Sequence, residues 1–251
     1  MIEIKNIVKK YGDKTVVDNV SLKIPSKKIT SFIGPNGAGK STLLSIMSRL
    51  NKKDAGKVLI EGKEIETWEN NALSKKISIL KQSNHINIRL TIKELVSFGR
   101  FPYSQGNLTQ EDWEHIDRAI AYMKLEDIQD KHLDQLSGGQ RQRAYIAMVI
   151  AQNTEYILLD EPLNNLDMKH AVEIMKILKW LVKTLGKTIV LVIHDINFAS
   201  CYSDHIVALS NGKVVSEGST ERIIDEEILG GIYDMDFKIE NINNQKICVY
   251  F

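Results

Sequence analysis

The chain has 251 residues, of which 43% are hydrophobic, 26% are charged, 15 are glycine and 4 are proline. This length suits one large globular domain or two small ones, and the composition excludes collagen-like and low-complexity proteins. Because 33 basic residues oppose 32 acidic ones, the net charge is +1, and no large electrostatic surface for nucleic acid or an anionic membrane is expected.

The two cysteines, Cys201 and Cys248, lie far apart and form no Cys-x-x-Cys motif. They are therefore expected to be reduced, buried thiols of a cytosolic protein. The N-terminus is charged and does not look like a signal peptide. The apolar runs are far shorter than the roughly 20 residues that a membrane span needs. A role at a membrane would therefore depend on a separate membrane partner.

Short strands dominate the N-terminal third of the chain. Apolar residues recur with near alternation at residues 2–7 and 16–24, which predicts two strands joined by a turn at Gly12 and Asp13. A strand at 30–33, a buried helix face at 43–47 and strands at 58–60 and 77–80 are predicted next, with turns at Gly56 and Gly62.

Helical patterns dominate about residues 83–155. Thr91 and Glu94 form a capping-box pattern, Thr109 with Asp112 opens a second helix, and Ser137 precedes a third. The remainder alternates strand and helix, which completes an α/β pattern with a helical insertion. The predicted elements are a strand at 156–159, a helix at 167–185 ended by Gly186, a strand at 188–193, a hairpin turn at Asn211 and Gly212, a helix at 221–229, and a hairpin ending at 248–251.

A glycine-rich loop follows the strand predicted at 30–33 and matches the pattern G-x-x-x-x-G-K-[ST]. Glycines let successive backbone N–H groups turn toward a phosphate, and the next helix points its positive end at the same anion. A plain glycine-rich turn is the alternative, but the strand and helix on either side favour a nucleotide site. The predicted ATP ligands are Gly34, Pro35, Asn36, Gly37, Ala38, Gly39, Lys40, Ser41 and Thr42, with Lys40 on the β- and γ-phosphates and the Ser41 hydroxyl on Mg²⁺.

The buried strand predicted at 156–159 runs directly into two acids, Asp160 and Glu161. An acid at the end of an apolar strand has to be solvated by an ion or by water. We expect Asp160 to hold Mg²⁺ through a water, and Glu161 to be the general base that activates the attacking water. Alone, the pair could be a helix cap and a surface acid, but the phosphate loop makes that interpretation the weaker one.

Two glycines, Gly138 and Gly139, follow Ser137 at the start of the third predicted helix, which Ser137 can cap. They would form a second anion cradle at a helix N-terminus. In isolation this would be a plain helix start. Together with the phosphate loop it resembles the nucleotide-binding subunit of an ATP-binding cassette (ABC) transporter, over at least residues 2–218. The resemblance implies that this second loop contacts the ATP held by a partner subunit through Ser137, Gly138, Gly139 and Gln140.

The resemblance also gives roles to residues outside the two loops. It implies that Tyr11 stacks on adenine, that Gln82 is a hinge glutamine sensing Mg²⁺ and water, and that His194 is a switch histidine near the γ-phosphate. Asp167 falls in the loop that crosses to the other subunit and binds nucleotide. The implied catalytic residues are thus Glu161, His194, Gln82 and Lys40, and the implied metal ligands are Ser41, Gln82 and Asp160.

The fold implied by the resemblance is a P-loop NTPase (RecA-like) α/β core with an N-terminal antiparallel β subdomain and an inserted α-helical subdomain. One ABC ATPase domain would span residues 1–251, with the core at about 1–82 and 156–251 and the helical subdomain at about 83–155. Because each ATP site would be split between two chains, a homodimer with ATP between its subunits is expected. A monomer would bind ATP but hydrolyse it poorly.

Three segments narrow the kind of transporter. Residues 98–103 and 141–152 resemble the importer group for iron–siderophores, haem and cobalamin, and residues 161–170 look most similar to the cassettes of Gram-positive ferric catecholate importers of the petrobactin type. The expected function is therefore ATP hydrolysis that energises uptake of a ferric siderophore, at the cytoplasmic face of the membrane. Haem, cobalamin or another metal chelate is the alternative cargo.

The expected partners are a second copy of the chain, integral membrane permease subunits and, indirectly, an extracellular siderophore-binding protein. Permease contact is expected at about residues 83–105, where Ile86, Ile88, Phe101 and Tyr103 are candidates, and the core of the insertion is the alternative place for these side chains. Two other function classes fit less well. Soluble cassettes acting on ribosomes or DNA usually carry two cassettes or a long insertion, and a non-hydrolysing scaffold would not need intact Lys40, Asp160 and Glu161.

Overall fold

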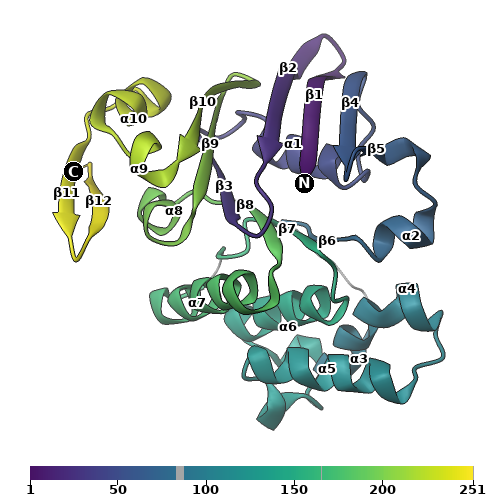
Figure 1. Ribbon diagram of the computed structural model, residues 1–251. Coiled ribbons are helices and arrows are strands. Elements are labelled where there is room, and N and C mark those ends of the chain that lie inside the picture. Colours follow the sequence, from purple (N-terminus) through teal and green to yellow (C-terminus); the bar gives the residue numbers. More distant parts are fainter. Residues whose placement is uncertain (83–87, 165, 251) are drawn as a thin grey trace. The chain divides into compact units, whose positions relative to one another are not determined.

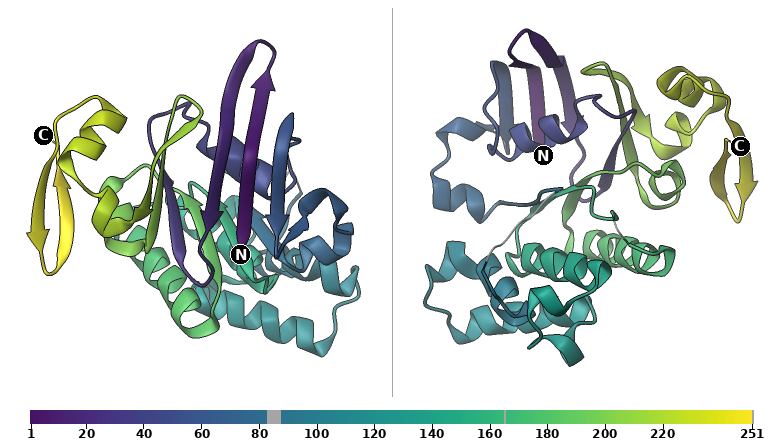
Figure 2. Two further views of the ribbon diagram at one scale, coloured as in Figure 1. Left: turned by 45° about the horizontal axis from the view of Figure 1, so that its top comes forward. Right: turned by 180° about the vertical axis from the view of Figure 1, so that it is seen from behind.

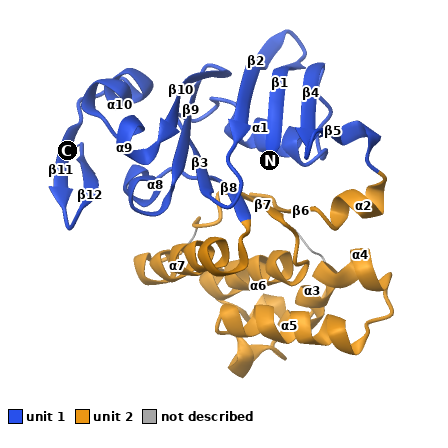
Figure 3. Ribbon diagram, in the orientation of Figure 1, with its two compact units in different colours: residues 1–68, 188–251 blue, residues 69–187 orange. Residues whose placement is uncertain are grey.

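A computed structural model describes residues 1–82, 88–164 and 166–250 (Figures 1 and 2). The chain divides into two compact units (Figure 3). Unit 1 combines Met1–Trp68 with Thr188–Phe251, and unit 2 is Glu69–Lys187. The helical subdomain predicted at about 83–155 falls within unit 2, and its boundaries stay a prediction. Among the described residues, no helix combines the length and the hydrophobicity that a membrane crossing demands.

The N-terminal part of unit 1 is an antiparallel sheet in the strand order β2-β1-β4-β5. The apolar residues of β1 do not alternate strictly, and irregularities of the backbone bring them to the same face of the sheet. The register between β1 and β2 shifts near Asn6 and Asn19, which have φ values of 50° and 52°. These shifts let Ile2, Ile4 and Ile7 all stay buried. The strands are β1 (Ile2–Tyr11), β2 (Lys14–Ile24), β4 (Ala55–Ile60) and β5 (Lys63–Glu64).

The turn predicted at Gly56 is wrong, because Gly56 lies inside β4. Its φ is +87°, and a Cβ atom there would lie 2.3 Å from the Asn6 carbonyl oxygen. Gly56 is therefore needed where β4 passes the irregular part of β1. The turn at Gly62, with φ of +80°, is confirmed.

The second sheet of unit 1 carries the phosphate loop. β3 (Ile29–Ile33) pairs in parallel with β8 (Thr188–Val192) on one side and with β9 (His205–Ser210) on the other. All five residues of both β3 and β8 are buried, which explains their continuous apolar sequence. β9 returns antiparallel as β10 (Lys213–Ser219) through Asn211 and Gly212, whose φ values of 49° and 78° match the predicted hairpin turn.

The helices of unit 1 are short, and the C-terminal one differs from the prediction. A single helix at 221–229 is wrong, because the Asp225 carboxylate accepts hydrogen bonds from the N–H groups of Glu227 and Ile228 and starts a new helix. The predicted last hairpin is confirmed, with its second strand ending at Val249, and Phe251 lies outside the described residues. The elements are α1 (Lys40–Met47), α8 (Ile196–Tyr202), α9 (Thr220–Ile223), α10 (Glu226–Tyr233), β11 (Lys238–Ile242) and β12 (Gln245–Val249).

The described residues of unit 2 form helices and one parallel strand pair, β6 with β7. The helix starts predicted at Thr91, Thr109 and Ser137 are confirmed. Each of the three residues forms a capping box, the arrangement predicted for Thr91, and they begin α3, α5 and α6. The elements are α2 (Asn70–Ser74), β6 (Ile77–Leu80), α3 (Ile92–Ser97), α4 (Phe101–Ser104), α5 (Gln110–Tyr122), α6 (Gly138–Ala151), β7 (Tyr156–Asp160) and α7 (Met168–Leu185), which ends at Gly186 as predicted.

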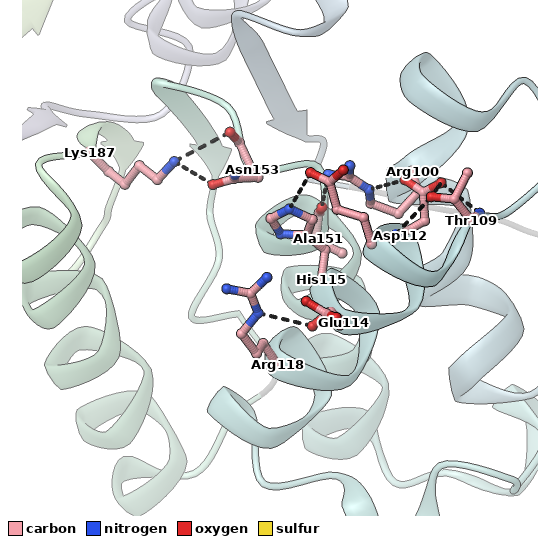
Figure 4. A network of polar contacts seen from close by, with 10 residues as sticks. Arg100, Thr109, Asp112, Glu114, His115, Arg118, Ala151, Asn153 and Lys187 are labelled. Atoms are coloured by element: carbon pink, nitrogen blue, oxygen red, sulfur yellow. Dashed lines mark hydrogen bonds and ion pairs between the residues drawn. The ribbon is translucent and has the colours of Figure 1, made fainter.

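A buried ion pair fixes the start of α5 (Figure 4). Arg100 and Asp112 are 3% exposed each, and the Arg100 Nε atom lies 2.8 Å from Asp112 Oδ1. Arg100 also donates to the carbonyl oxygen of Ala151 at the end of α6. Burial alone would raise the pKa of Asp112, but hydrogen bonds from Thr109 and Arg100 outweigh it and lower the pKa. Arg100 therefore ties α5 to α6.

Candidate nucleotide-binding site

The phosphate loop runs from the end of β3 to the first residue of α1, as predicted. Two of its glycines are required by close contacts. A Cβ atom on Gly34 would lie 1.9 Å from the Leu209 carbonyl oxygen, and one on Gly39 would lie 2.5 Å from the Val16 carbonyl oxygen. Both glycines also have positive φ values, 132° and 96°. The loop is thus held between β2 and β9, and only glycine fits at these two points.

The turn between β9 and β10 supports the same loop from outside. The Gly212 N–H donates to the Ala38 carbonyl oxygen at 3.2 Å, and the Gly212 carbonyl oxygen accepts from the Asp18 N–H at 2.8 Å. The hairpin turn therefore joins β2 to the phosphate loop through two backbone hydrogen bonds.

Lys40 lies inside the curve of the loop and is 5% exposed. Its Nζ atom donates to the carbonyl oxygens of Gly34 at 2.7 Å and Pro35 at 2.9 Å. A phosphate group bound in the loop would offer stronger, anionic acceptors than these carbonyls. Ser41 and Thr42 follow in the first turn of α1, half-buried. This turn contains no acidic side chain that would repel an anion.

Unit 1 holds two more of the predicted site residues. Tyr11 ends β1 with 52% of its surface exposed, so much of its ring is available to a ligand, although the Lys9 ammonium lies 5.3 Å from the ring centroid. His194 is also exposed. Phe32 in β3 pairs with Val192 in β8, and both Gly34 and His194 come two residues later. Because the strands are parallel, the histidine and the loop lie at the same edge of the sheet.

Unit 2 brings Gln82 and Glu161 together by the same geometry. Leu80 pairs with Leu159 in the parallel strands β6 and β7, and each of the two polar residues comes two positions later. The Gln82 Nε2 atom donates to Glu161 Oε2 at 2.7 Å. Glu161 is only 9% exposed and has φ of 51°, a backbone conformation that is costly for a residue with a side chain. The carboxylate is thus held in place by its surroundings.

A third side chain contacts the same carboxylate. The Asn164 Nδ2 atom donates to Glu161 Oε2 from three residues further along the chain. No role is predicted for Asn164 from the sequence, although its spacing from Glu161 suits a tight turn. Asp160, the last residue of β7, is 7% exposed. Asp160 and Glu161 are therefore both buried, unlike ordinary surface acids.

The second glycine pair begins α6, a helix of 14 residues. The Ser137 Oγ atom accepts from the Gln140 N–H at 3.2 Å, and Gln140 Oε1 accepts from the Ser137 N–H at 3.0 Å. Ser137 and Gly138 are exposed, and Gly139 is half-buried beside Leu166 and His170. The loop is thus preformed and open to an anion at the positive end of a long helix.

Asp167 is the N-cap of α7. Its Oδ1 atom accepts from the His170 N–H at 2.9 Å and lies 2.8 Å from His170 Nδ1. These contacts lower the pKa of Asp167, with the backbone hydrogen bond as the largest cause. The side chain therefore already has a structural role, in addition to any contact with nucleotide.

The predicted site residues thus fall into two groups, one in each unit. Unit 1 holds Tyr11, the phosphate loop and His194, and unit 2 holds Gln82, Asp160, Glu161, the second loop and Asp167. Sequence reasoning missed a side chain that touches the phosphate loop. The Tyr233 hydroxyl at the end of α10 accepts a hydrogen bond from the Gly34 N–H at 2.9 Å. Since the two residues are 199 positions apart, no local pattern could have paired them.

Comparison with known proteins decides the family. Residues 17–164 match the ABC transporter family. Over all 251 residues, and the full length of both chains, this chain is 68% identical to the petrobactin import ATP-binding protein YclP of Bacillus subtilis (strain 168). The chain belongs to the ABC transporter family. A second relative, the petrobactin import ATP-binding protein FatE of Bacillus anthracis, is 44% identical over 250 residues and 100% of both chains.

Solved cassettes share the fold. The dimeric, post-hydrolysis state of the ATP-binding cassette MJ0796 with bound ADP and phosphate has a TM-score of 0.79 and 35% identity, over 88% of this chain and 99% of that one. The predictions of an ABC ATPase and of a P-loop NTPase fold are therefore confirmed. The roles of the individual site residues stay predictions.

Proposed function

We propose that this chain is the ATP-hydrolysing subunit of an importer for ferric siderophores of the petrobactin type. The observation that carries the proposal is the 68% identity to a petrobactin import ATP-binding protein over the full length of both chains. The cargo is assigned through relatives because a cassette acts on nucleotide, and none of the site residues described above is specific for a siderophore. The intact phosphate loop and the positioned Glu161 support hydrolysis as the source of energy.

Glu161 has the setting that a general base needs. Its carboxylate would accept a proton from the water that attacks the γ-phosphate, and ADP and phosphate would then leave. The hydrogen bonds from Gln82 and Asn164 converge on Oε2 and orient the carboxylate. Lys40 would exchange the carbonyl oxygens of Gly34 and Pro35 for β- and γ-phosphate oxygens. His194, exposed at the edge of unit 1, would contact the γ-phosphate.

The residues proposed as metal ligands fit Mg²⁺ by their chemistry. Ser41 provides a hydroxyl, Gln82 an amide oxygen and Asp160 a carboxylate, and Mg²⁺ prefers such oxygen ligands. When bound with ATP, the ion would supply positive charge against the phosphate oxygens. Tyr11, whose ring is half exposed, would stack on the adenine.

The second loop supports a homodimer that shares its ATP sites. Ser137, Gly138, Gly139 and Gln140 form an open helix N-terminus, and we infer that it binds the γ-phosphate of ATP held by a second copy of this chain. The related cassette MJ0796 is dimeric with ADP and phosphate bound. Asp167 is the N-cap of α7, so it would contact the shared nucleotide from the start of that helix.

The proposed permease contact lies in unit 2. Of its candidate residues, Ile88, Phe101 and Tyr103 have 67%, 60% and 37% of their surface exposed, whereas Ile86 lies outside the described residues. Such exposure argues against the alternative that these side chains form the core of the insertion. These three exposed apolar side chains, all within residues 88–103, are suited to contact a partner protein such as a membrane permease. We therefore place the chain at the cytoplasmic face of the membrane, working with permease subunits and an extracellular siderophore-binding protein.

The function is tested by uptake of iron in a strain that lacks this chain. Ferric petrobactin, a ferric hydroxamate and ferric citrate are supplied one at a time, and the chain is restored as wild type or as Glu161→Gln. We expect the wild type alone to restore uptake of ferric petrobactin. Restored uptake of a different carrier would change the cargo, and no dependence of any carrier on the chain would refute siderophore import.

A further inference from the structure

Gly34, the first residue of the phosphate loop, is held from two sides. Its N–H donates to the Tyr233 hydroxyl at 2.9 Å, and its carbonyl oxygen accepts from Lys40 Nζ at 2.7 Å. The backbone of Gly34, with φ of +132°, connects these two hydrogen-bonded groups. The tyrosine and the lysine therefore hold the two peptide groups that flank Gly34.

Tyr233 is suited to be a permanent acceptor. A tyrosine hydroxyl is neutral at physiological pH, and burial raises the pKa of Tyr233 further, to about 12. The residue is the last of α10, and Asp234 ends the helix with φ of 55°. The Tyr233 ring packs against Phe237 with a centroid distance of 5.9 Å, and Phe237 packs against Tyr250 at 5.7 Å. This aromatic cluster fixes the direction in which the hydroxyl points.

The hairpin that supplies Tyr250 is itself anchored to unit 1. In Figures 1 and 2 the hairpin of β11 and β12 lies at the outer edge of unit 1, beyond α10. The Asn197 side chain of α8 accepts from the Cys248 N–H at 2.7 Å and donates to the Cys248 carbonyl oxygen at 3.1 Å. The Ser200 hydroxyl donates to the Lys246 carbonyl oxygen at 2.6 Å. The cluster behind Tyr233 thus rests on a fixed support.

We propose that Tyr233 is a positioning residue for the phosphate loop, holding the Gly34 N–H so that the loop keeps its shape when Lys40 turns to the phosphates. This inference rests on the proposed ATP-hydrolysing function and deepens it. When nucleotide binds, Lys40 has to give up the Gly34 carbonyl oxygen, and one of the two groups that hold Gly34 is lost. The Tyr233 bond involves the other peptide group and can persist. The C-terminal segment therefore lowers the cost of ordering the loop around phosphate.

The test compares Tyr233→Phe with Tyr250→Phe in the full chain. Both changes remove one hydroxyl from the same aromatic cluster, but only the first removes the acceptor for Gly34. Titration calorimetry with Mg-ATP and with Mg-ADP gives the dissociation constants, measured well below the unfolding temperature of each variant. We expect both constants to rise about three- to tenfold for Tyr233→Phe, as for the loss of one neutral hydrogen bond. Tyr250→Phe should stay within about twofold of wild type.

Two further measurements separate positioning from general stability. In the assembled transporter, Tyr233→Phe should raise the KM for ATP by a similar factor and leave kcat within about twofold. Hydrogen exchange should be faster at the Gly34 amide in Tyr233→Phe than in Tyr250→Phe. Equal nucleotide affinity and equal exchange in the two variants would overturn the inference, as would an equal weakening in both. If the wild type itself bound no ATP, the proposed function would fail instead, and all three proteins would behave alike.

Discussion

Replacing Glu161 by glutamine separates proton transfer from positioning at the proposed catalytic centre. Glutamine has nearly the same volume and can still accept the hydrogen bond that Gln82 donates at 2.7 Å. The backbone of residue 161, with φ of 51°, should be unaffected because both side chains branch beyond Cβ. What the variant loses is the carboxylate that would take the proton of the attacking water.

The magnitude distinguishes the two roles. Loss of a general base lowers a rate by about 10²- to 10⁴-fold, which corresponds to about 2.7–5.5 kcal/mol in the activation free energy. Weakening one hydrogen bond to the carboxylate costs about 1 kcal/mol, or roughly fivefold. We therefore expect Glu161→Gln to fall in the larger range, whereas Asn164→Ala, which keeps the carboxylate and removes one donor, should lose no more than about tenfold.

The assay is ATP turnover by the assembled transporter, together with ATP binding by the isolated chain. Glu161→Gln should bind ATP with nearly wild-type affinity and form a stable dimer with ATP. Glu173→Gln on α7 is a matched control in the same unit. It also replaces a carboxylate by an amide, but at a residue that pairs with Lys124 at 3.2 Å. Turnover of Glu161→Gln within about threefold of wild type would refute its role as the base, and so would an equal loss in Asn164→Ala.

Four other outcomes follow from the structure. Tyr11→Ala should weaken ATP binding about 5- to 150-fold by equilibrium titration, the range for a lost stacking contact, and an unchanged affinity with a large fall in kcat would contradict this. Gly34→Ala should lower both the melting temperature and ATP affinity because its Cβ would lie 1.9 Å from a backbone oxygen, whereas Gly231→Ala, with open space around it, should change neither. Arg100→Ala should cost about 3–5 kcal/mol of unfolding free energy in denaturant titrations, because it leaves a buried Asp112 unpaired. Since the pKa of Asp112 is below its usual value of about 3.9, its stabilising effect is complete above that pH and is lost as the pH falls through the folded-state pKa, so the wild type but not Asp112→Asn should show this loss.

Local features of the chain were predictable because their physics is local. The phosphate loop, the helix starts at Thr109 and Ser137, and the turn at Asn211 and Gly212 each depend on residues within a few positions of one another. The pairing of two neighbouring strands also allows a prediction, because residues that follow parallel strands lie at the same edge of the sheet. Once β6 and β7 are taken as parallel, Gln82 and Glu161 fall at the same edge, which the hydrogen bond between them bears out.

Features that depend on distant segments were not predictable from one sequence. Gly56 has the look of a turn, but it serves a close approach to Asn6, 50 positions earlier in the chain. The break between α9 and α10 depends on whether Asp225 caps a helix or merely belongs to one, and the apolar pattern continues through it. The contact of Tyr233 with Gly34 joins the end of α10 to the start of the phosphate loop, 199 positions away, so it exists only once these segments have been brought together by folding.

The central claim is that this cassette couples ATP hydrolysis to siderophore import. Its most direct test is the uptake of iron-labelled ferric petrobactin into proteoliposomes that contain the chain and its permease, with the siderophore-binding protein outside. The account predicts uptake that requires ATP at the cassette and stops when Glu161→Gln replaces the wild type. Uptake that continues with Glu161→Gln, or ATP hydrolysis by the wild type that carries no ferric siderophore across, would contradict it.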